Sequence, residues 1–201
     1  QNCVDYIETF TSTVNDVNEG VVFQGDLVIS QVGDKCIFQT NGIPNHDFND
    51  GGSAFPNSVS EQNDQIEITI TPTIANQSTS ISLQVDNAIM LNGVKIDLLA
   101  AGCFGIGNGK IGCNDMNQAW RYDPMHEANG FQVDSHNAHA QPDGTYHYHG
   151  SPLALFDDSD SQDSPVVGFA ADGFPIFGSY FDDQGAIRKA TSSYRLKLGS
   201  R

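Results

Sequence analysis

The sequence contains few basic side chains and no long apolar segment. Nine lysines and arginines stand against 25 aspartates and glutamates, so the net charge is −16 at pH 7. A surface of this charge repels nucleic acid and anionic membranes, and we expect neither as a partner. No apolar run approaches the roughly 18 residues that a membrane-spanning helix requires, so we also expect no membrane span.

Common catalytic and cofactor motifs are absent as well. There is no GxSxG nucleophile motif, and the glycine-rich 105–109 segment has no helix pattern after it, which argues against a nucleotide site. None of the four cysteines forms a CxxC pair. Cys103 and Cys113 flank a glycine-rich loop that a disulfide would close, and Cys3 would then bond Cys36. Two disulfides imply an oxidising compartment and predict a secreted, periplasmic or cell-surface protein.

Patterns typical of β-strands occupy most of the chain. Residues 21–39 contain two β-rich runs separated by turn residues, and Gln65–Thr73 alternates isoleucine with polar residues, as a half-buried strand does. Residues 80–85 alternate in the same way. Asn92-Gly93 lies between apolar runs of residues 88–99 and indicates a hairpin.

A helix pattern is nearly absent. Only residues 115–127 favour a short helix, and Pro124 limits its length. We therefore predict a mainly β fold: one domain over residues 1–201, built as an antiparallel sandwich or a distorted barrel with one short helix and long loops. Residues 1–20 are weakly patterned and predict a lead-in segment. Because the chain begins at Gln1, we expect a mature form without its leader.

The most informative stretch is residues 134–150, DSHNAHAQPDGTYHYHG, which holds four of the six histidines. Pro142-Asp143-Gly144 predicts a turn that folds this segment back on itself. Residues 145–149 then alternate β-branched or aromatic side chains with imidazoles. Since strand side chains alternate between faces, His147 and His149 should share one face and the two tyrosines the other.

These residues resemble the signature of the YHYH-domain family of mainly bacterial secreted or surface proteins. Three blocks are similar to that family and stand in the same order: NGIPNHDF at residues 41–48, DSHNAHAQPDGTYHYHGSP at 134–152 and GFAADGFPIFGSY at 168–180. The likeness runs from about the second strand to the end of the chain, where members often continue with a further segment. The resemblance implies a shared site at His46, His139, His147, His149 and Asp172, and it names no reaction.

Clustered imidazoles predict a transition-metal site. Neutral imidazole is the most frequent protein ligand for zinc and copper, whereas an isolated histidine is more often structural. The expected ligands are His139, His147 and His149, with His46 as a fourth. We expect His136 and Asp134 in the surrounding hydrogen-bonding shell.

The acidic residues allow two interpretations. Asp172, in an Asp-Gly turn, fits either simple turn geometry or a catalytic role as the base beside a metal or the carboxylate that orients a histidine. Oxygen-bearing side chains also cluster where calcium could bind, although the EF-hand pattern is missing. These are Asp157, Asp158, Asp160 and Asp163, and in another loop Asn45, Asp47, Asn49 and Asp50.

Two function classes follow. The first is a secreted metal-binding β domain with a histidine cluster for zinc or copper, acting as a metal-dependent hydrolase or as a metal carrier. The second is a calcium-assisted adhesion or carbohydrate-binding module in which the histidines are structural. In both classes the ligand is a small molecule or a surface polymer whose identity the sequence does not give. The oligomeric state does not follow from the sequence either.

Overall fold

The fold consists mainly of β-strands, as the sequence predicts. The computed structural model describes residues 1–79, 81, 85–106, 113, 115, 117, 118, 120–159 and 161–193. The strands in this part of the chain are β1 (Thr9–Asp16), β2 (Val21–Val32), β3 (Lys35–Thr40), β4 (Asp64–Thr69), β5 (Ala88–Met90), β6 (Lys95–Ile96), β7 (Ala138–Ala140), β8 (Tyr146–Tyr148), β9 (Val166–Ala170), β10 (Pro175–Phe177), β11 (Tyr180–Asp183) and β12 (Ala186–Lys189).

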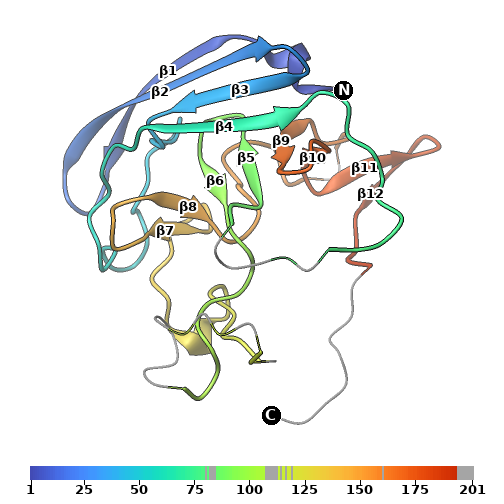
Figure 1. Cartoon of the computed structure of the whole chain (residues 1–201). Helices are drawn as coiled ribbons and strands as arrows, with labels where there is room; N and C mark the ends of the chain where they lie inside the picture. The colour runs from blue at the N-terminus through green and yellow to red at the C-terminus, as the bar shows by residue number, and fades with distance from the viewer. Residues whose placement is uncertain are drawn as a thin grey trace.

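The strands form three sheets. One sheet has the order β1-β2-β3-β4, a second has the order β10-β9-β5-β6-β8-β7, and β11 pairs with β12. In Figure 1 the four-stranded sheet lies above the six-stranded one. No sheet in the described part of the chain closes into a barrel, and one pair, β6 with β8, is parallel rather than antiparallel.

The four-stranded sheet follows the sequence pattern closely. The two runs in residues 21–39 become β2 and β3, joined at Gly33, which has a φ of 61°. Alternate residues of β2 face inward, so Leu27 and Ile29 are buried while their neighbours are not. The predicted strand from Gln65 becomes β4, with Ile68 buried. The lead-in segment expected at residues 1–20 contains a full strand, β1.

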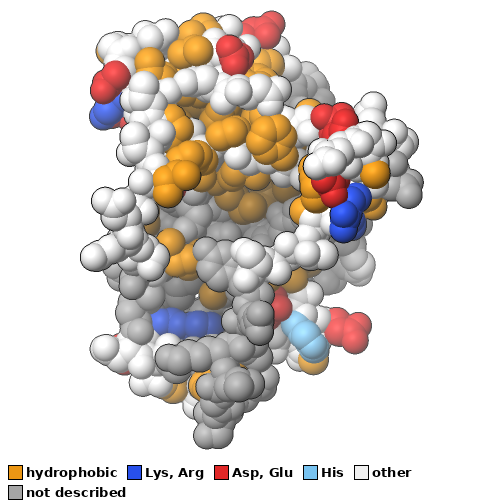
Figure 2. Space-filling view, turned by 90° about the vertical axis from the view of Figure 1, so that its right-hand side faces the viewer, with side chains coloured by type: hydrophobic (Ala, Val, Ile, Leu, Met, Phe, Trp, Pro, Cys, Tyr) orange, Lys and Arg blue, Asp and Glu red, His pale blue; other side chains and the backbone are white. Residues whose placement is uncertain are grey.

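The two larger sheets share a hydrophobic core. Side chains of β2, β3 and β4 pack in one buried cluster with Ile89 of β5 and with Val166 and Phe169 of β9. The Cys3–Cys36 disulfide joins this cluster and fixes the first residues of the chain to β3. The second predicted bond, Cys103–Cys113, is also present. The face turned to the right of Figure 1 carries a gathering of hydrophobic side chains in its upper half (Figure 2).

Helix is confined to two short 3-10 turns in the described residues, η1 (Cys3–Tyr6) and η2 (Glu127–Asn129). Parts of the helix expected over residues 115–127 lie outside the described residues. The same holds for most of the strand expected at residues 80–85, for part of the 105–109 loop, for Asp160 and for the chain after residue 193. No helix among the described residues is both long enough and apolar enough to cross a membrane.

Candidate metal centre

The β7–β8 hairpin places two histidines opposite each other. The two strands pair in a register that sets His139 against His147. Their connection is the predicted turn, in which Gly144 has a φ of 87° and its N–H donates to the carbonyl of Gln141. A Cβ at Gly144 would lie 2.1 Å from the hydroxyl of Ser60, so both backbone conformation and space require glycine there.

Alternation along β8 separates imidazoles from phenols. His147 points to one face, and His149, two residues later, lies on the same side. Tyr146 and Tyr148 point to the other face, where they are 1% and 0% exposed. The prediction drawn from the YHYH stretch is therefore confirmed: one short strand presents imidazoles on one side and buried phenols on the other.

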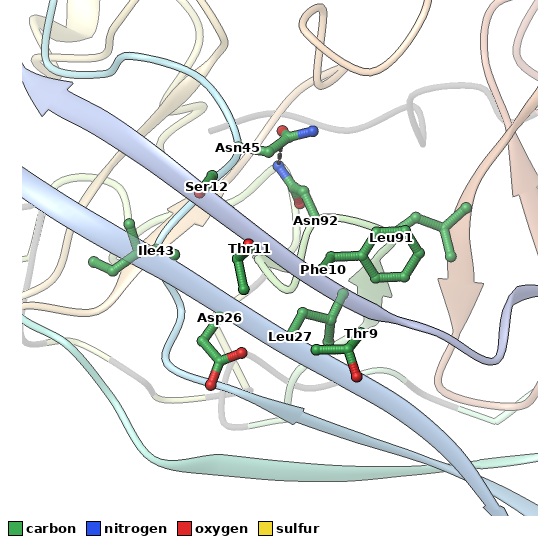
Figure 3. Close-up of a pocket in the computed structure, with 11 residues that line it drawn as sticks. Thr9, Phe10, Thr11, Ser12, Asp26, Leu27, Ile43, Asn45, Leu91 and Asn92 are labelled. Atoms are coloured by element: carbon green, nitrogen blue, oxygen red, sulfur yellow. Dashed lines mark hydrogen bonds between the residues drawn. The ribbon is translucent and has the colours of Figure 1, made fainter.

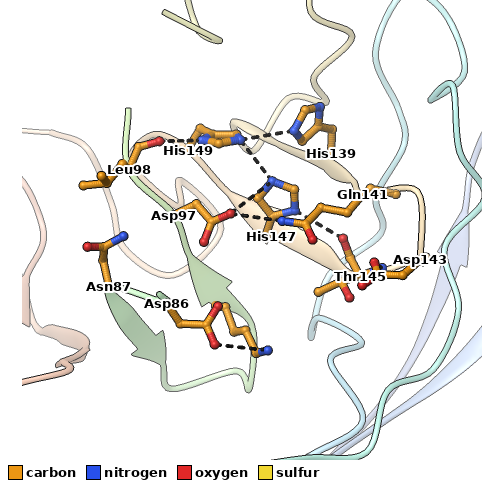
Figure 4. A network of polar contacts seen from close by, with 12 residues as sticks. Asp86, Asn87, Asp97, Leu98, His139, Gln141, Asp143, Thr145, His147 and His149 are labelled. Atoms are coloured by element: carbon orange, nitrogen blue, oxygen red, sulfur yellow. Dashed lines mark hydrogen bonds and ion pairs between the residues drawn. The ribbon is translucent and has the colours of Figure 1, made fainter. Parts of the chain in front are cut away.

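Three imidazoles converge on the first face (Figure 4). The Nε2 atom of His149 lies 3.0 Å from Nε2 of His147 and 3.2 Å from Nε2 of His139. Three nitrogens bound tetrahedrally to zinc at its usual bond length lie about 3.3 Å apart. In the part of the chain that the structure describes, these residues form the only group of three or more metal-ligating side chains whose ligand atoms lie within 4.8 Å of one another.

Backbone carbonyls set the tautomers of two of these rings. Nδ1 of His149 donates to the carbonyl of Leu98 at 2.8 Å, and Nδ1 of His147 donates to the carbonyl of Thr145 at 3.2 Å. A carbonyl only accepts, so each Nδ1 carries the ring proton and each Nε2 presents a lone pair. This is the arrangement in which proteins hold metal-binding histidines.

Burial keeps the triad uncharged. Desolvation lowers the pKa of His139 to about 4 and that of His147 to about 3, and it also lowers the pKa of His149. Neutral rings with Nδ1 protonated cannot form a hydrogen bond between the Nε2 atoms of His147 and His149, although these lie 3.0 Å apart. Two lone pairs therefore face each other, and a cation between them would turn this repulsion into coordination.

A carboxylate that the sequence patterns did not indicate stands beside the triad. Oδ2 of Asp97 lies 3.7 Å from Nε2 of His147 and accepts a hydrogen bond from Gln141 at 3.1 Å. Burial raises the pKa of Asp97 to about 6. Because His147 is neutral near pH 7, the Asp97–His147 contact is not an ion pair. The signal available in the sequence was an acidic residue within the apolar 88–99 run.

His46, expected as a fourth ligand, lies on the tyrosine face. Its Nδ1 donates to the carbonyl of Asp47, and its Nε2 accepts from the hydroxyl of Tyr148 at 2.7 Å. The same hydroxyl accepts from the side chain of Asn92 at 2.9 Å. Burial lowers the pKa of His46 to about 4. The structure thus uses both ring nitrogens of His46 in hydrogen bonds and does not bring this residue to the triad.

His136 and Asp134, expected around the metal, also lie on the tyrosine face. The ring of His136 packs against that of His46 with centroids 4.0 Å apart and planes inclined at 49°, and its buried Nδ1 has no hydrogen-bond partner among the described residues. Asp134 accepts hydrogen bonds from Tyr146 and from the backbone of His136 and Ala138. Asp134 thereby holds the loop before β7, and neither side chain is hydrogen-bonded to the triad in the described part of the chain.

The remaining acidic candidates lie elsewhere. Asp172 is exposed in the β9–β10 turn, and β5 and β6 separate β9 from β8 in the sheet. In the acidic loops, Asp158 pairs with Lys189 at 3.0 Å, and Asp50 accepts two hydrogen bonds from Ser135. These carboxylates hold loops together, and no group of them qualifies as a metal site in the described residues.

The stability of the metal-free protein should fall as the pH drops below 6.5. The pKa values of His46 and His139 are about 4 and that of His147 about 3, so the unfolded chain takes up protons before the folded one. The stabilisation is complete above pH 6.5 and is lost as the pH falls towards 4. Burial also raises the pKa of Asp97 and of Asp134, which gives the opposite slope, but these two groups stand against four histidines whose pKa is lowered.

Urea unfolding with a chelator present measures this dependence. We expect the free energy of unfolding to decrease steadily between pH 6.5 and 4, and a His139→Gln variant to show a shallower decrease. A free energy that stays constant over this range would mean that the imidazoles of the folded protein take up protons at the same pH as those of the unfolded chain, in contradiction to the neutral triad.

Comparison with known proteins agrees with the motif in β8. The model of the YHYH protein family matches residues 65–200, which include all three histidines of the triad and Asp97. The match begins after the NGIPNHDF block, so His46 falls outside it. No curated protein and no solved structure matches the chain. Since the matched segment covers more than half of the sequence, the chain belongs to the YHYH protein family.

Proposed function

We propose that the protein binds one zinc or copper ion through the Nε2 atoms of His139, His147 and His149. The observation that carries this proposal is the pair of Nε2 lone pairs held 3.0 Å apart while both Nδ1 protons are donated to carbonyls. All-imidazole ligand sets suit zinc and copper and are poor ligands for calcium or magnesium. The net charge of −16 also favours cations.

Three protein ligands leave a tetrahedral ion with one open position. An ion bound in this way supplies activation of water, the chemistry of metal-dependent hydrolases. Asp97 is close enough to act there as a hydrogen-bond acceptor, and Gln141 holds its carboxylate in place. The same open position would allow a carrier to release its ion. We favour hydrolysis, because a partly buried carboxylate beside the ion is a base that a carrier does not need.

Replacement of Asp97 by asparagine should have opposite effects on folding and on metal binding. Burial of the carboxylate disfavours its charged form at pH 7, so the metal-free variant should be more stable by on the order of 1 kcal/mol. This gain should vanish below pH 4, where the wild-type side chain is protonated in both states. The affinity for zinc should fall by roughly 10- to 100-fold, because a neighbouring anion is lost.

Chemical denaturation and competition titration measure the two quantities. Asp172→Asn is the matched control, because Asp172 is exposed and lies away from the triad, and it should change neither. Equal zinc affinity in the wild type and Asp97→Asn would show that Asp97 does not contribute to metal binding.

We further propose that the protein acts outside the cytoplasm, secreted, periplasmic or on the cell surface. The two disulfides support this placement, because such bonds persist mainly in oxidising compartments. The calcium-assisted adhesion alternative has less support, since the described acidic loops use their carboxylates in internal hydrogen bonds and ion pairs.

Metal titration of chelator-stripped protein tests the function. We expect one equivalent of zinc or copper to bind and to raise the melting temperature. Stabilisation should reach about 2.7 kcal/mol when the free ion is at one hundred times its dissociation constant. Calcium at the same concentration should have no effect. Binding of calcium alone, with no response to zinc or copper, would reverse the choice between the two function classes.

A further inference from the structure

The outer edge of β1 carries unpaired backbone groups. β1 is the first strand of the four-stranded sheet, and only β2 pairs along its length. The N–H of Ile29 donates to the carbonyl of Glu8, so in this antiparallel register Phe10 and Ser12 also bond towards β2. Thr9, Thr11 and Thr13 therefore direct their N–H and C=O groups away from the sheet, and no backbone partner for them exists among the described residues.

The chain itself already adds a segment to the downstream part of this edge. The N–H of Phe48 donates to the carbonyl of Asn15, and the N–H of Val17 donates to the carbonyl of Phe48, both at 3.0 Å. This pairing with residues 47–48 is parallel and stops at Asn15. The edge is thus able to accept an added segment, and the part from Thr9 to Thr13 is left open.

A pocket of about 360 Å³ runs along this open edge (Figure 3). Its apolar lining comes from Phe10, Leu27, Ile43 and Leu91, while Asn45 and Asn92 supply amide groups. An extended peptide paired with β1 would point every second side chain towards this pocket. Backbone pairing and a side-chain pocket are thereby combined in one place.

The edge lacks the usual protection against strand addition. Exposed edge strands normally carry lysine, proline or a bulge. β1 has the sequence TFTSTVND and pairs with β2 without any register shift. The opposite edge strand, β4, does carry charged contacts, with Lys95 bonded to Asp64 at 3.0 Å and Lys35 paired with Glu67.

We propose that the edge from Thr9 to Thr13 binds an extended basic peptide segment by strand addition, with one apolar side chain seated in the adjoining pocket. The charge of the surroundings selects this partner. Glu8 and Asp26 are exposed beside the open edge, and the chain carries a net charge of −16. Two copies of this chain would repel each other at such an edge, whereas lysine or arginine in a partner strand would be attracted.

A synthetic peptide tests the proposal. The probe is a capped heptapeptide in which lysine alternates with valine or leucine, and two controls replace lysine by glutamate or methylate alternate backbone nitrogens. We expect the lysine peptide to slow hydrogen exchange at the amides of Thr9, Thr11 and Thr13 in full-length protein. The two control peptides should leave these amides unprotected, because one lacks charge complementarity and the other lacks backbone donors.

A proline variant separates backbone pairing from surface attraction. Thr11→Pro removes an outward N–H without removing a bond to β2, a change that edge strands tolerate. It should weaken peptide binding by about tenfold, as expected for loss of one hydrogen bond and of close strand pairing. Thr11→Val keeps the N–H and should bind within about twofold of the wild type.

Each other outcome overturns the proposal. The proposal is wrong if millimolar lysine peptide leaves hydrogen exchange at the three threonine amides unchanged. This test uses the wild-type protein, so it holds even if Thr11→Pro does not fold. Equal binding of the glutamate peptide, or full binding by folded Thr11→Pro, would contradict the proposal as well. A wild-type dimer in sedimentation that Thr11→Pro dissociates would assign the edge to a second copy instead.

Discussion

His147→Ala should lower the affinity for zinc or copper by more than about 100-fold, whereas His46→Ala should leave it almost unchanged. Loss of a residue that only supports a ligand already lowers affinity by 10- to 100-fold, and His147 supplies a ligand atom. Its ring is 2% exposed and its Nε2 lies 3.0 Å from that of His149. His46 is the matched control, since it is also a largely buried neutral histidine but lies on the opposite face of β8.

Competition titration with a chromophoric chelator measures both affinities. Circular dichroism must first show that the variants fold, because each removes a buried ring. If His147→Ala does not fold, His149→Ala provides the same comparison at a half-buried position. Equal losses for His46→Ala and the triad variants would mean that His46 ligates the same ion as the triad, as the ligand set expected from the sequence would have it.

Removal of the Cys3–Cys36 disulfide should destabilise the protein by about 3 to 4 kcal/mol. The bond joins residues 33 positions apart, and release of a loop of this length increases the entropy of the unfolded chain by about that amount. It also fixes η1 against the buried cluster under the four-stranded sheet. Cys103–Cys113 joins residues only 10 positions apart, so its removal should lower the free energy of unfolding by about 1 kcal/mol less.

Denaturant unfolding of the two double-alanine variants gives these values, with reduced wild-type protein as a check. A larger effect for Cys103–Cys113 than for Cys3–Cys36 would contradict the loop-entropy argument. Such a result would show instead that the segment around Cys103 contributes packing that the sequence separation does not reveal.

Local patterns predicted the elements that depend on nearest neighbours. Polar and apolar residues alternate over residues 65–69, and this segment forms most of β4. Turn residues mark the hairpins, so Asn92-Gly93 joins β5 to β6 and Gly144 lies between β7 and β8. The two faces of the YHYH strand follow from the same alternation.

Long-range pairing could not be read from these patterns. Asp97 reaches His147 because β6 pairs in parallel with β8, which lies about fifty residues later in the chain. A sequence gives no register for such a pair. His46 lies in a loop and is held on the tyrosine face of β8 by its hydrogen bond with Tyr148. The spacing of residues in the sequence does not reveal on which face of the strand the loop packs.

His136 shows the same limit over a short distance. His139 follows only three positions later, yet Asn137 between them adopts a left-handed conformation with a φ of 66°. The turn before β7 is further held by Asp134, which accepts from the backbone of His136 and Ala138. His136 and His139 therefore point to different sides of the hairpin, although we expected His136 in the hydrogen-bonding shell around the metal.

X-ray absorption spectroscopy of zinc-loaded protein, combined with its crystal structure, tests the metal site most directly. We expect three nitrogen ligands at about 2.0 to 2.1 Å, contributed by Nε2 of His139, His147 and His149, with Asp97 beside the fourth position. An ion bound through His46 or His136, or three separated imidazoles with no ion after zinc is added, would contradict it.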